Sequence, residues 1–160
     1  MREMQVSEIT KAVAALFLQA NYVIGKDVTD KLMAAKAEEP SPLGGMVLEQ
    51  ILDNNRIGAE ESLPVCQDTG MSVVFITVGQ DVHLTGGGLE EAVNEGVRQA
   101  YTTGYLRKSI ADDPLFDRKN TGDNTPCVIH TRLVPGDKVH IMAIAKGFGS
   151  ENMSQLKMLT

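Results

Sequence analysis

Three consecutive polar residues, Cys66, Gln67 and Asp68, are the strongest candidates for chemistry in this sequence. They bring a thiol, a carboxamide and a carboxylate together in a turn-like segment that directly precedes the apolar run 71–78. A strand normally buries such a run, and polar loops beside buried strands often carry catalytic or binding residues. We therefore expect a functional loop at the point where this strand begins.

Each of these side chains also has a plainer interpretation. A free cysteine is most often a small buried hydrophobic residue, although the polar neighbours of Cys66 favour a ligand. Asp68-Thr69-Gly70 fits a turn in which the aspartate bonds its own backbone. The same triplet occurs in aspartic proteases, where two carboxylates share a proton. That assignment is rejected, because those proteases are almost entirely β-structured and three helical segments come first here.

A second glycine-containing segment, 146–152, has the sequence Lys-Gly-Phe-Gly-Ser-Glu-Asn and follows another strand-like run. Two glycines allow a backbone to approach a ligand closely. If the chain turns helical at this point, its free amides favour an anion such as a carboxylate. The three glycines 86–88 precede a helical pattern in a similar way, but a flexible turn is the simpler interpretation there.

Together, segments 63–71 and 146–152 resemble the cluster-binding region of the iron–sulfur hydro-lyases. These are the class I fumarate hydratases and the related L-tartrate dehydratases. The resemblance covers most of the chain after residue 40, and it corresponds to the first part of the α subunit or to the N-terminal half of the fused forms. It implies a [4Fe-4S] cluster with three thiolate ligands, one of them Cys66, and an open iron that acts as a Lewis acid. It also implies that Gln67 and Asp68 contact the substrate, with Asp68 as the catalytic candidate.

The resemblance adds two substrate-binding candidates, Arg107 and Gly149. Arg107 lies where the family presents an arginine in a Leu-Arg-x-Ser pattern, and a guanidinium binds a carboxylate through a planar two-donor fork. A solvated surface arginine is the equal alternative. Phe148 replaces the middle glycine of the family's Lys-Gly-Gly-Gly-Ser, so the shape of this loop is open. Segment 120–126 also resembles the family's Asn-Thr-Pro segment.

The cluster ligands in this sequence are incomplete. Cys127 begins an apolar strand-like run after Pro126, so we interpret it as a structural residue, and the family's other two cysteines lie beyond residue 160. One thiolate cannot hold a cubane cluster, so we expect this chain alone to lack the cluster and to be inactive. The family's α part continues beyond residue 160 and needs a β subunit or C-terminal domain, which also holds most of the proton-transferring residues. No general base is therefore assigned here.

The reaction implied by the resemblance is the reversible hydration of fumarate to (S)-malate, a small dicarboxylate. L-Tartrate dehydratase is the alternative within the class, and nothing in the sequence separates the two. A non-catalytic folding or assembly module for a β subunit is the alternative outside it.

Composition fits a single globular domain spanning residues 1–160, with 42% hydrophobic and 22% charged residues. A net charge of −6 without a basic cluster argues against nucleic acid and anionic membranes as partners. No apolar run is long enough for a membrane span, and the first residues lack a signal-peptide pattern. Two cysteines are too few for a disulfide framework, which favours the cytoplasm. An oligomer is the expected assembly.

The elements that must position these residues follow from hydrophobic spacing. Helices are predicted from Ser7 as cap to Gly25, over 29–38, and from Ser41 as cap to the asparagines 54–55. Strands are predicted over 71–78 and 81–84, and a helix from Leu89 to Tyr101. Runs 127–134 and 138–145 are predicted to form a hairpin around Pro135-Gly136-Asp137. The fold class is therefore α+β, with N-terminal helices, a mostly antiparallel sheet and a crossing helix.

The three histidines are scattered in the sequence. Two of them, His130 and His140, fall on the predicted hairpin and would be neighbours across it. Two imidazoles without a clear third ligand make a weak zinc site, so histidines packed within strands are the preferred interpretation.

Overall fold

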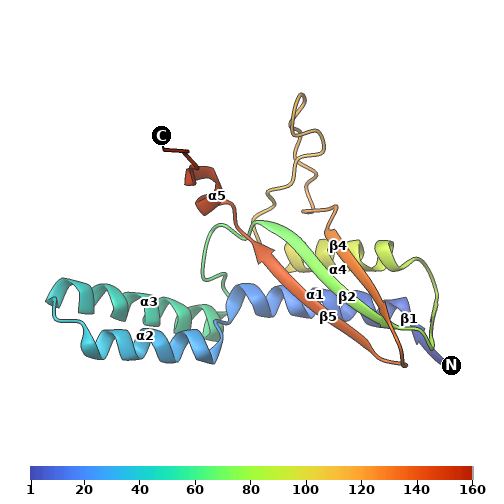
Figure 1. Ribbon diagram of the computed structural model, residues 1–160, viewed down its shortest axis with the longest axis horizontal. Coiled ribbons are helices and arrows are strands. Elements are labelled where there is room, and N and C mark those ends of the chain that lie inside the picture. The colour runs from blue at the N-terminus through green and yellow to red at the C-terminus, as the bar shows by residue number, and fades with distance from the viewer. Residues whose placement is uncertain (160) are drawn as a thin grey trace.

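The computed structural model describes residues 1–159, apart from the side chains of Ser150 and Glu151. Its helices and strands confirm the α+β class (Figure 1). In chain order they are β1 (Arg2–Gln5), α1 (Val6–Tyr22), α2 (Lys26–Glu38), α3 (Pro42–Glu61), β2 (Met71–Gly79), β3 (Val82–Thr85), α4 (Leu89–Thr103), β4 (Val128–Val134), β5 (Val139–Lys146) and α5 (Gly149–Met153).

The hydrophobic core lies between the helix pair α1 and α4 and one face of a three-stranded sheet (Figure 1). Helical spacing brings Val13 and Phe17 of α1 onto the core, and α4 contributes Val93 and Val97, all four fully buried. Alternate residues of β2, namely Val74, Ile76 and Val78, face the same core. Burying each of these side chains contributes roughly 1.5–3 kcal/mol. The helix pair thus packs against one face of the sheet and stabilises it.

The three-stranded sheet is mixed, with strand order β4-β2-β5. Strand β2 pairs in parallel with β4 and antiparallel with β5. The two runs predicted as a hairpin are indeed strands, and they run antiparallel to each other. Their predicted pairing is wrong, because β2 lies between them.

The end of β2 explains why β4 and β5 do not pair with each other. The main-chain amide of Gly79 donates to the carbonyl of Lys138 (2.8 Å), so the Pro-Gly turn bridges the central strand. A Cβ at Gly79 would overlap the carbonyl of Gly136 and would lie 2.9 Å from the amide nitrogen of Asp137. A glycine at this position therefore lets the turn cross β2, and the strand without a charged side chain takes the centre of the sheet.

A second, two-stranded sheet pairs β1 with β3 in parallel. Strand β3 agrees with the predicted run 81–84 to within one residue, whereas β1 was not predicted. It is only four residues long and its burial is low, so it carries little alternating pattern.

The helix ends differ from the predictions at three points. The N-cap of α1 is Gln5, so Ser7 lies inside the first turn, and Gly25 is the N-cap of α2 rather than the end of α1. Helix α3 continues past Asn54 to Glu61, and the Asn54 amide donates to the carbonyl of Val65 (2.9 Å) instead of ending the helix. The Ser41 cap is confirmed, since its hydroxyl accepts from the amide of Gly44 (3.3 Å).

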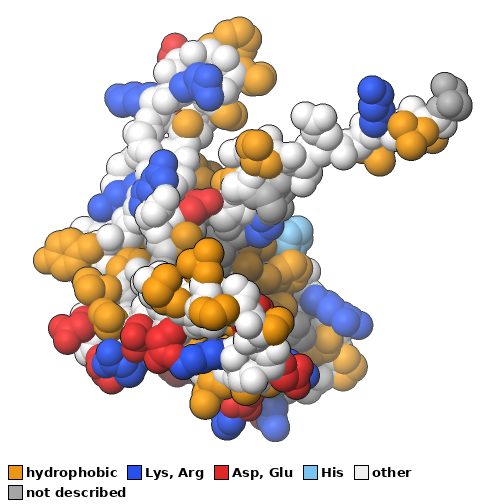
Figure 2. Space-filling model, turned by 90° about the vertical axis from the view of Figure 1, so that its left-hand side faces the viewer, with side chains coloured by type: hydrophobic (Ala, Val, Ile, Leu, Met, Phe, Trp, Pro, Cys, Tyr) orange, Lys and Arg blue, Asp and Glu red, His pale blue; other side chains and the backbone are white. Residues whose placement is uncertain are grey.

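Helices α2 and α3 form an antiparallel arm that projects from the body (Figure 1). No residue of α2 is buried, and the arm exposes several large apolar side chains between charged ones (Figure 2). These are Val28, Met33, Leu43, Met46, Val47, Ile51 and Ile57. Within the described residues, no helix is long and apolar enough to cross a membrane.

Candidate active site

Three loops meet at one end of the three-stranded sheet. Strands β2 and β4 run in parallel and both begin there, while the antiparallel β5 ends there, with Met71 opposite Lys146. The segment 66–70 before β2, the turn 124–127 before β4 and the segment 147–149 after β5 are therefore neighbours in space. Both chemically suggestive motifs of the sequence lie at this end.

Gly70 allows the first and last of these loops to touch. It has a φ of +58°, and a Cβ there would overlap the carbonyl of Lys146 and lie 2.6 Å from the amide nitrogen of Gly147. Only glycine satisfies both the left-handed backbone and this contact between main chains. The 66–70 loop therefore lies directly against the end of β5.

The carboxylate of Asp68 is the direct link between the two motifs. Its Oδ2 accepts a hydrogen bond from the main-chain amide of Phe148 (3.1 Å). A Cβ at Gly147 would come within 2.9 Å of the same oxygen, so glycine makes room for the carboxylate. The backbone of Phe148 does not adopt a positive φ, so this position does not require glycine. The glycines of segment 146–152 were expected to let the backbone approach a ligand. In the structure, this backbone approaches the side chain of Asp68 in the same chain.

Arg107 is held near this loop by its main chain. Its carbonyl accepts from the hydroxyl of Thr69 (2.7 Å), and the preceding Leu106 is buried in the core. The side chain of Arg107 is exposed and forms no ion pair with any side chain that the structure describes. Its guanidinium is therefore available to an anion.

The remaining predicted residues lie on the same end of the molecule. Cys66 and Gln67 are exposed in the 66–70 loop, and Gly149 is exposed at the start of α5. Helix α5 is only five residues long. The side chains of Ser150 and Glu151, which belong to the predicted motif, lie outside the described part of the chain.

Sequence reasoning missed a set of buried polar side chains beneath these loops: Thr69, Ser72, Tyr101 and Asn124. Tyr101 ends the helix predicted over 89–101. Its hydroxyl donates to the carbonyl of Thr69 (2.8 Å), and burial raises the pKa of this phenol. Asn124 belongs to the Asn-Thr-Pro segment noted in the sequence. The signal for Ser72 was a polar residue inside an apolar run.

The comparison with known families agrees with this geometry. A family model described as "Fumarate hydratase (Fumerase)" matches residues 10–160. The chain belongs to the fumarate hydratase family. The resemblance read from the two sequence motifs is thereby confirmed.

The relatives of this member of the fumarate hydratase family are named for two different activities. It is 33% identical over 156 residues to the "Putative L(+)-tartrate dehydratase subunit alpha" of Methanocaldococcus jannaschii, covering 95% of the chain and 55% of the relative. It is 35% identical over 151 residues to "Fumarate hydratase class I, anaerobic" of Escherichia coli K12, covering 92% of the chain and 27% of the relative. The "L(+)-tartrate dehydratase subunit alpha" of E. coli UTI89 is 29% identical over 162 residues, covering 99% of the chain and 52% of the relative.

The chain therefore spans about half the length of the tartrate dehydratase α subunits that it matches. It spans about a quarter of the anaerobic fumarate hydratase. These relatives are named as a hydratase and as dehydratases, which supports a hydro-lyase family for this chain.

Cys127 has different surroundings from the exposed Cys66 in this fumarate hydratase family member. Cys127 is buried, and desolvation raises the pKa of its thiol to about 12. Its main-chain amide donates to the side-chain oxygen of Asn94 (2.8 Å), which fixes the start of β4 against α4. A neutral thiol in this position favours a packing role.

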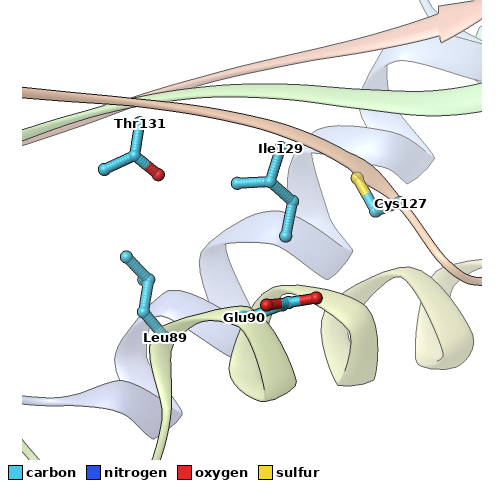
Figure 3. Close-up of a pocket in the computed structure, with 5 residues that line it drawn as sticks. All are labelled: Leu89, Glu90, Cys127, Ile129 and Thr131. Carbon is cyan, nitrogen blue, oxygen red and sulfur yellow. The ribbon is translucent and has the colours of Figure 1, made fainter.

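Cys127 also borders a cavity of about 310 Å³ between the start of α4 and β4 (Figure 3). The lining residues are Leu89, Glu90, Cys127, Ile129 and Thr131. None of the residues predicted to bind substrate or metal lines this cavity.

The histidines do not form the pair that the hairpin predicted. His130 stacks on Phe75 with ring centroids 4.7 Å apart, and β2 separates it from His140. Among the side chains that the structure describes, which leave out Glu151, no group of three His, Cys, Asp or Glu could hold a metal ion.

Proposed function

We propose that residues 1–160 form one domain, the N-terminal part of the α component of a [4Fe-4S] hydro-lyase that reversibly hydrates fumarate to (S)-malate. Family membership supports a hydro-lyase. The observation that carries the site is the hydrogen bond from the Phe148 amide to Asp68 Oδ2 (3.1 Å), because it unites the two motifs at one place.

Cys66 fits the role of one cluster ligand. Its thiol is exposed on the loop before β2, whereas the buried Cys127 is not available to a metal. The other two thiolates would come from polypeptide outside these 160 residues. When bound, the cluster would supply a Lewis-acidic iron that helps hydroxide leave. A reducing cytoplasm suits such a thiolate ligand.

The chain's own residues would bind and orient the substrate. Asp68 is held in place by the Phe148 amide, which leaves its other carboxylate oxygen for a hydroxyl or proton of the substrate. The Arg107 guanidinium would bind one carboxylate of the substrate through its two-donor fork. Gln67 and Gly149, both exposed beside Asp68 and Phe148 in the sequence, would complete the contacts from this component.

L-Tartrate dehydratase is the alternative, since two of the α-subunit relatives carry that name. Those names also support a β subunit, or an equivalent C-terminal domain, as the partner in a larger oligomer. The test is to assay the completed αβ enzyme with (S)-malate and L-tartrate as separate substrates. Dehydration of tartrate alone would replace the fumarate assignment, and no activity with either would favour the assembly module.

We expect the isolated 160-residue chain to bind no [4Fe-4S] cluster after anaerobic reconstitution, because Cys66 is its only accessible thiol. The measurement is iron content together with absorbance near roughly 400 nm, where thiolate-bound clusters absorb. One cluster per monomeric chain would contradict this prediction. Mass analysis would identify dimers that share ligands.

Replacing Arg107 by lysine in the completed enzyme is expected to impair substrate use and leave the fold intact. A point ammonium cannot reproduce the two-donor fork, so kcat/KM should fall about tenfold or more. The melting temperature should change little, because the exposed side chain has no described ion pair. A lower melting temperature with unchanged kinetics would assign Arg107 to the structure instead.

A further inference from the structure

The buried polar side chains of this chain are concentrated beneath the candidate site. Of the four polar residues that are buried among those the structure describes, Thr69, Ser72 and Asn124 lie together there, and only Asn21 lies elsewhere. The hydroxyl of the buried Tyr101 joins the same group. Burying polar groups is unfavourable unless each is hydrogen-bonded, so a cluster of buried polar side chains at one place suggests that they have a specific role there.

Asn124 is the residue that connects the most segments in this group. Its Nδ2 donates to the carbonyl of Gly70 (3.1 Å) and to the hydroxyl of Ser72 (3.4 Å). Its Oδ1 accepts from the main-chain amide of Ser109 (2.7 Å). The side chain is fully buried, and its backbone has a φ of +65°, which asparagine tolerates better than most residues.

One carboxamide therefore joins the loop carrying Cys66 and Asp68 to the segment carrying Arg107. Gly70 follows Asp68 by two residues, and Ser109 follows Arg107 by two residues. The hydrogen bond from Thr69 to the Arg107 carbonyl is a second connection between the same two segments.

The segment that Asn124 holds has few other hydrogen bonds to the rest of the molecule. After Leu106, all residues up to 120 are exposed or half-buried, and they form a loop that projects from the body (Figure 1). The buried Leu106 fixes only one point of this segment. Inside this loop, the side-chain amide of Asn120 donates to the carbonyl of Lys108 (2.9 Å) and the main-chain amide of Thr121 to the carbonyl of Ile110 (3.0 Å). These bonds hold the loop to itself, so without the Ser109 contact the Thr69 hydrogen bond alone, among the described residues, would join the backbone around Arg107 to the 66–70 loop.

We propose that Asn124 is a positioning residue, which sets the place of Arg107 relative to Asp68 and thereby the fit of a dicarboxylate substrate. The proposal rests on the proposed function. It assigns no contact with the substrate to Asn124, which is buried and acts through Gly70 and Ser109. Its effect should therefore appear in substrate binding more than in the cluster.

The test compares Asn124→Gly with the wild type in the completed αβ enzyme, assayed with (S)-malate. Glycine adopts the positive φ without strain, so this variant removes the side chain alone. We expect the KM to rise about tenfold or more, with a smaller change in kcat and an unchanged iron content. Asn94→Ala is the control, since it also deletes a carboxamide that accepts a main-chain amide (Cys127, 2.8 Å), but this bond joins the start of β4 to α4 and reaches neither the 66–70 loop nor the Arg107 segment. It should lower the melting temperature and leave the KM unchanged.

A second measurement follows the contact itself in the 160-residue chain. Hydrogen exchange at the Ser109 amide should become at least about tenfold faster in Asn124→Gly and stay unchanged in Asn94→Ala. Asn124→Asp keeps an acceptor for Ser109 but has no amide protons for Gly70, so it should retain the protection and still raise the KM.

The outcomes separate the positioning role from the proposed function. An active wild-type enzyme whose KM is unchanged by Asn124→Gly refutes the positioning role alone, whatever the exchange rate. Equal KM increases in Asn124→Gly and Asn94→Ala refute it as well, because the effect would then be one of general stability. A wild-type enzyme without hydratase activity refutes the proposed function, and the positioning role falls with it.

Discussion

Replacing Gly70 by alanine is expected to be the most destabilising single-methyl change in the site. The new Cβ would overlap the main-chain carbonyl of Lys146 and lie 2.6 Å from the amide nitrogen of Gly147. Main-chain atoms in a paired strand cannot move aside as a flexible side chain does. Together with the positive φ of 58°, this should lower the free energy of unfolding by about 4 kcal/mol.

The measurement is thermal unfolding of the 160-residue chain. A loss of that size corresponds to a drop in Tm of about 10 °C for a chain of this length. Gly122→Ala is the matched control, because Gly122 also has a positive φ (81°) but no atom within 4 Å of its added Cβ. It should lose only about 1 kcal/mol, the cost of the backbone conformation. Equal losses in the two variants would mean that the contact with β5 is unimportant.

Replacing Cys66 by serine is expected to abolish hydratase activity and most of the bound iron in the completed enzyme. A cluster held by three thiolates becomes labile when one is lost, and a serine hydroxyl is a poor substitute for a thiolate. Cys127→Ser is the paired variant. It should keep cluster content near normal and lower the free energy of unfolding by about 1–2 kcal/mol, because it buries a hydroxyl in place of a neutral thiol.

The two variants are compared by iron and sulfide analysis, absorbance spectra and (S)-malate turnover. The structural basis for the difference is that Cys66 is exposed, whereas burial raises the pKa of the Cys127 thiol to about 12. If both variants lost iron equally, the assignment of Cys127 to packing would be wrong.

The sequence alone was enough to predict the family and the main elements. The motifs around Cys66 and 146–152 are local, since their residues are contiguous and their types are chemically unusual together. The apolar periods of α1, α4 and β2 are also local, and these elements lie close to where they were predicted. Secondary structure and short motifs depend on neighbouring residues, which a sequence displays directly.

The sequence was misleading where the outcome depended on distant partners. Pro135-Gly136 predicted a hairpin, because a Pro-Gly turn usually joins strands that pair with each other. The tertiary structure places β2 between them instead. It is the strand of this sheet without a charged side chain or a histidine, so it loses least at the buried centre, and Gly79 lets the turn pass over it.

Only the tertiary structure decided how the site is assembled. The contact between Asp68 and Phe148 joins residues 80 positions apart, and Asn124 bonds residues 15 to 54 positions away. Nothing in the local sequence specifies such contacts, because they exist only once parallel β4 and antiparallel β5 have docked on either side of β2. The sequence therefore determined which groups are available for chemistry, and the packing of three strands on two helices determined which of them meet.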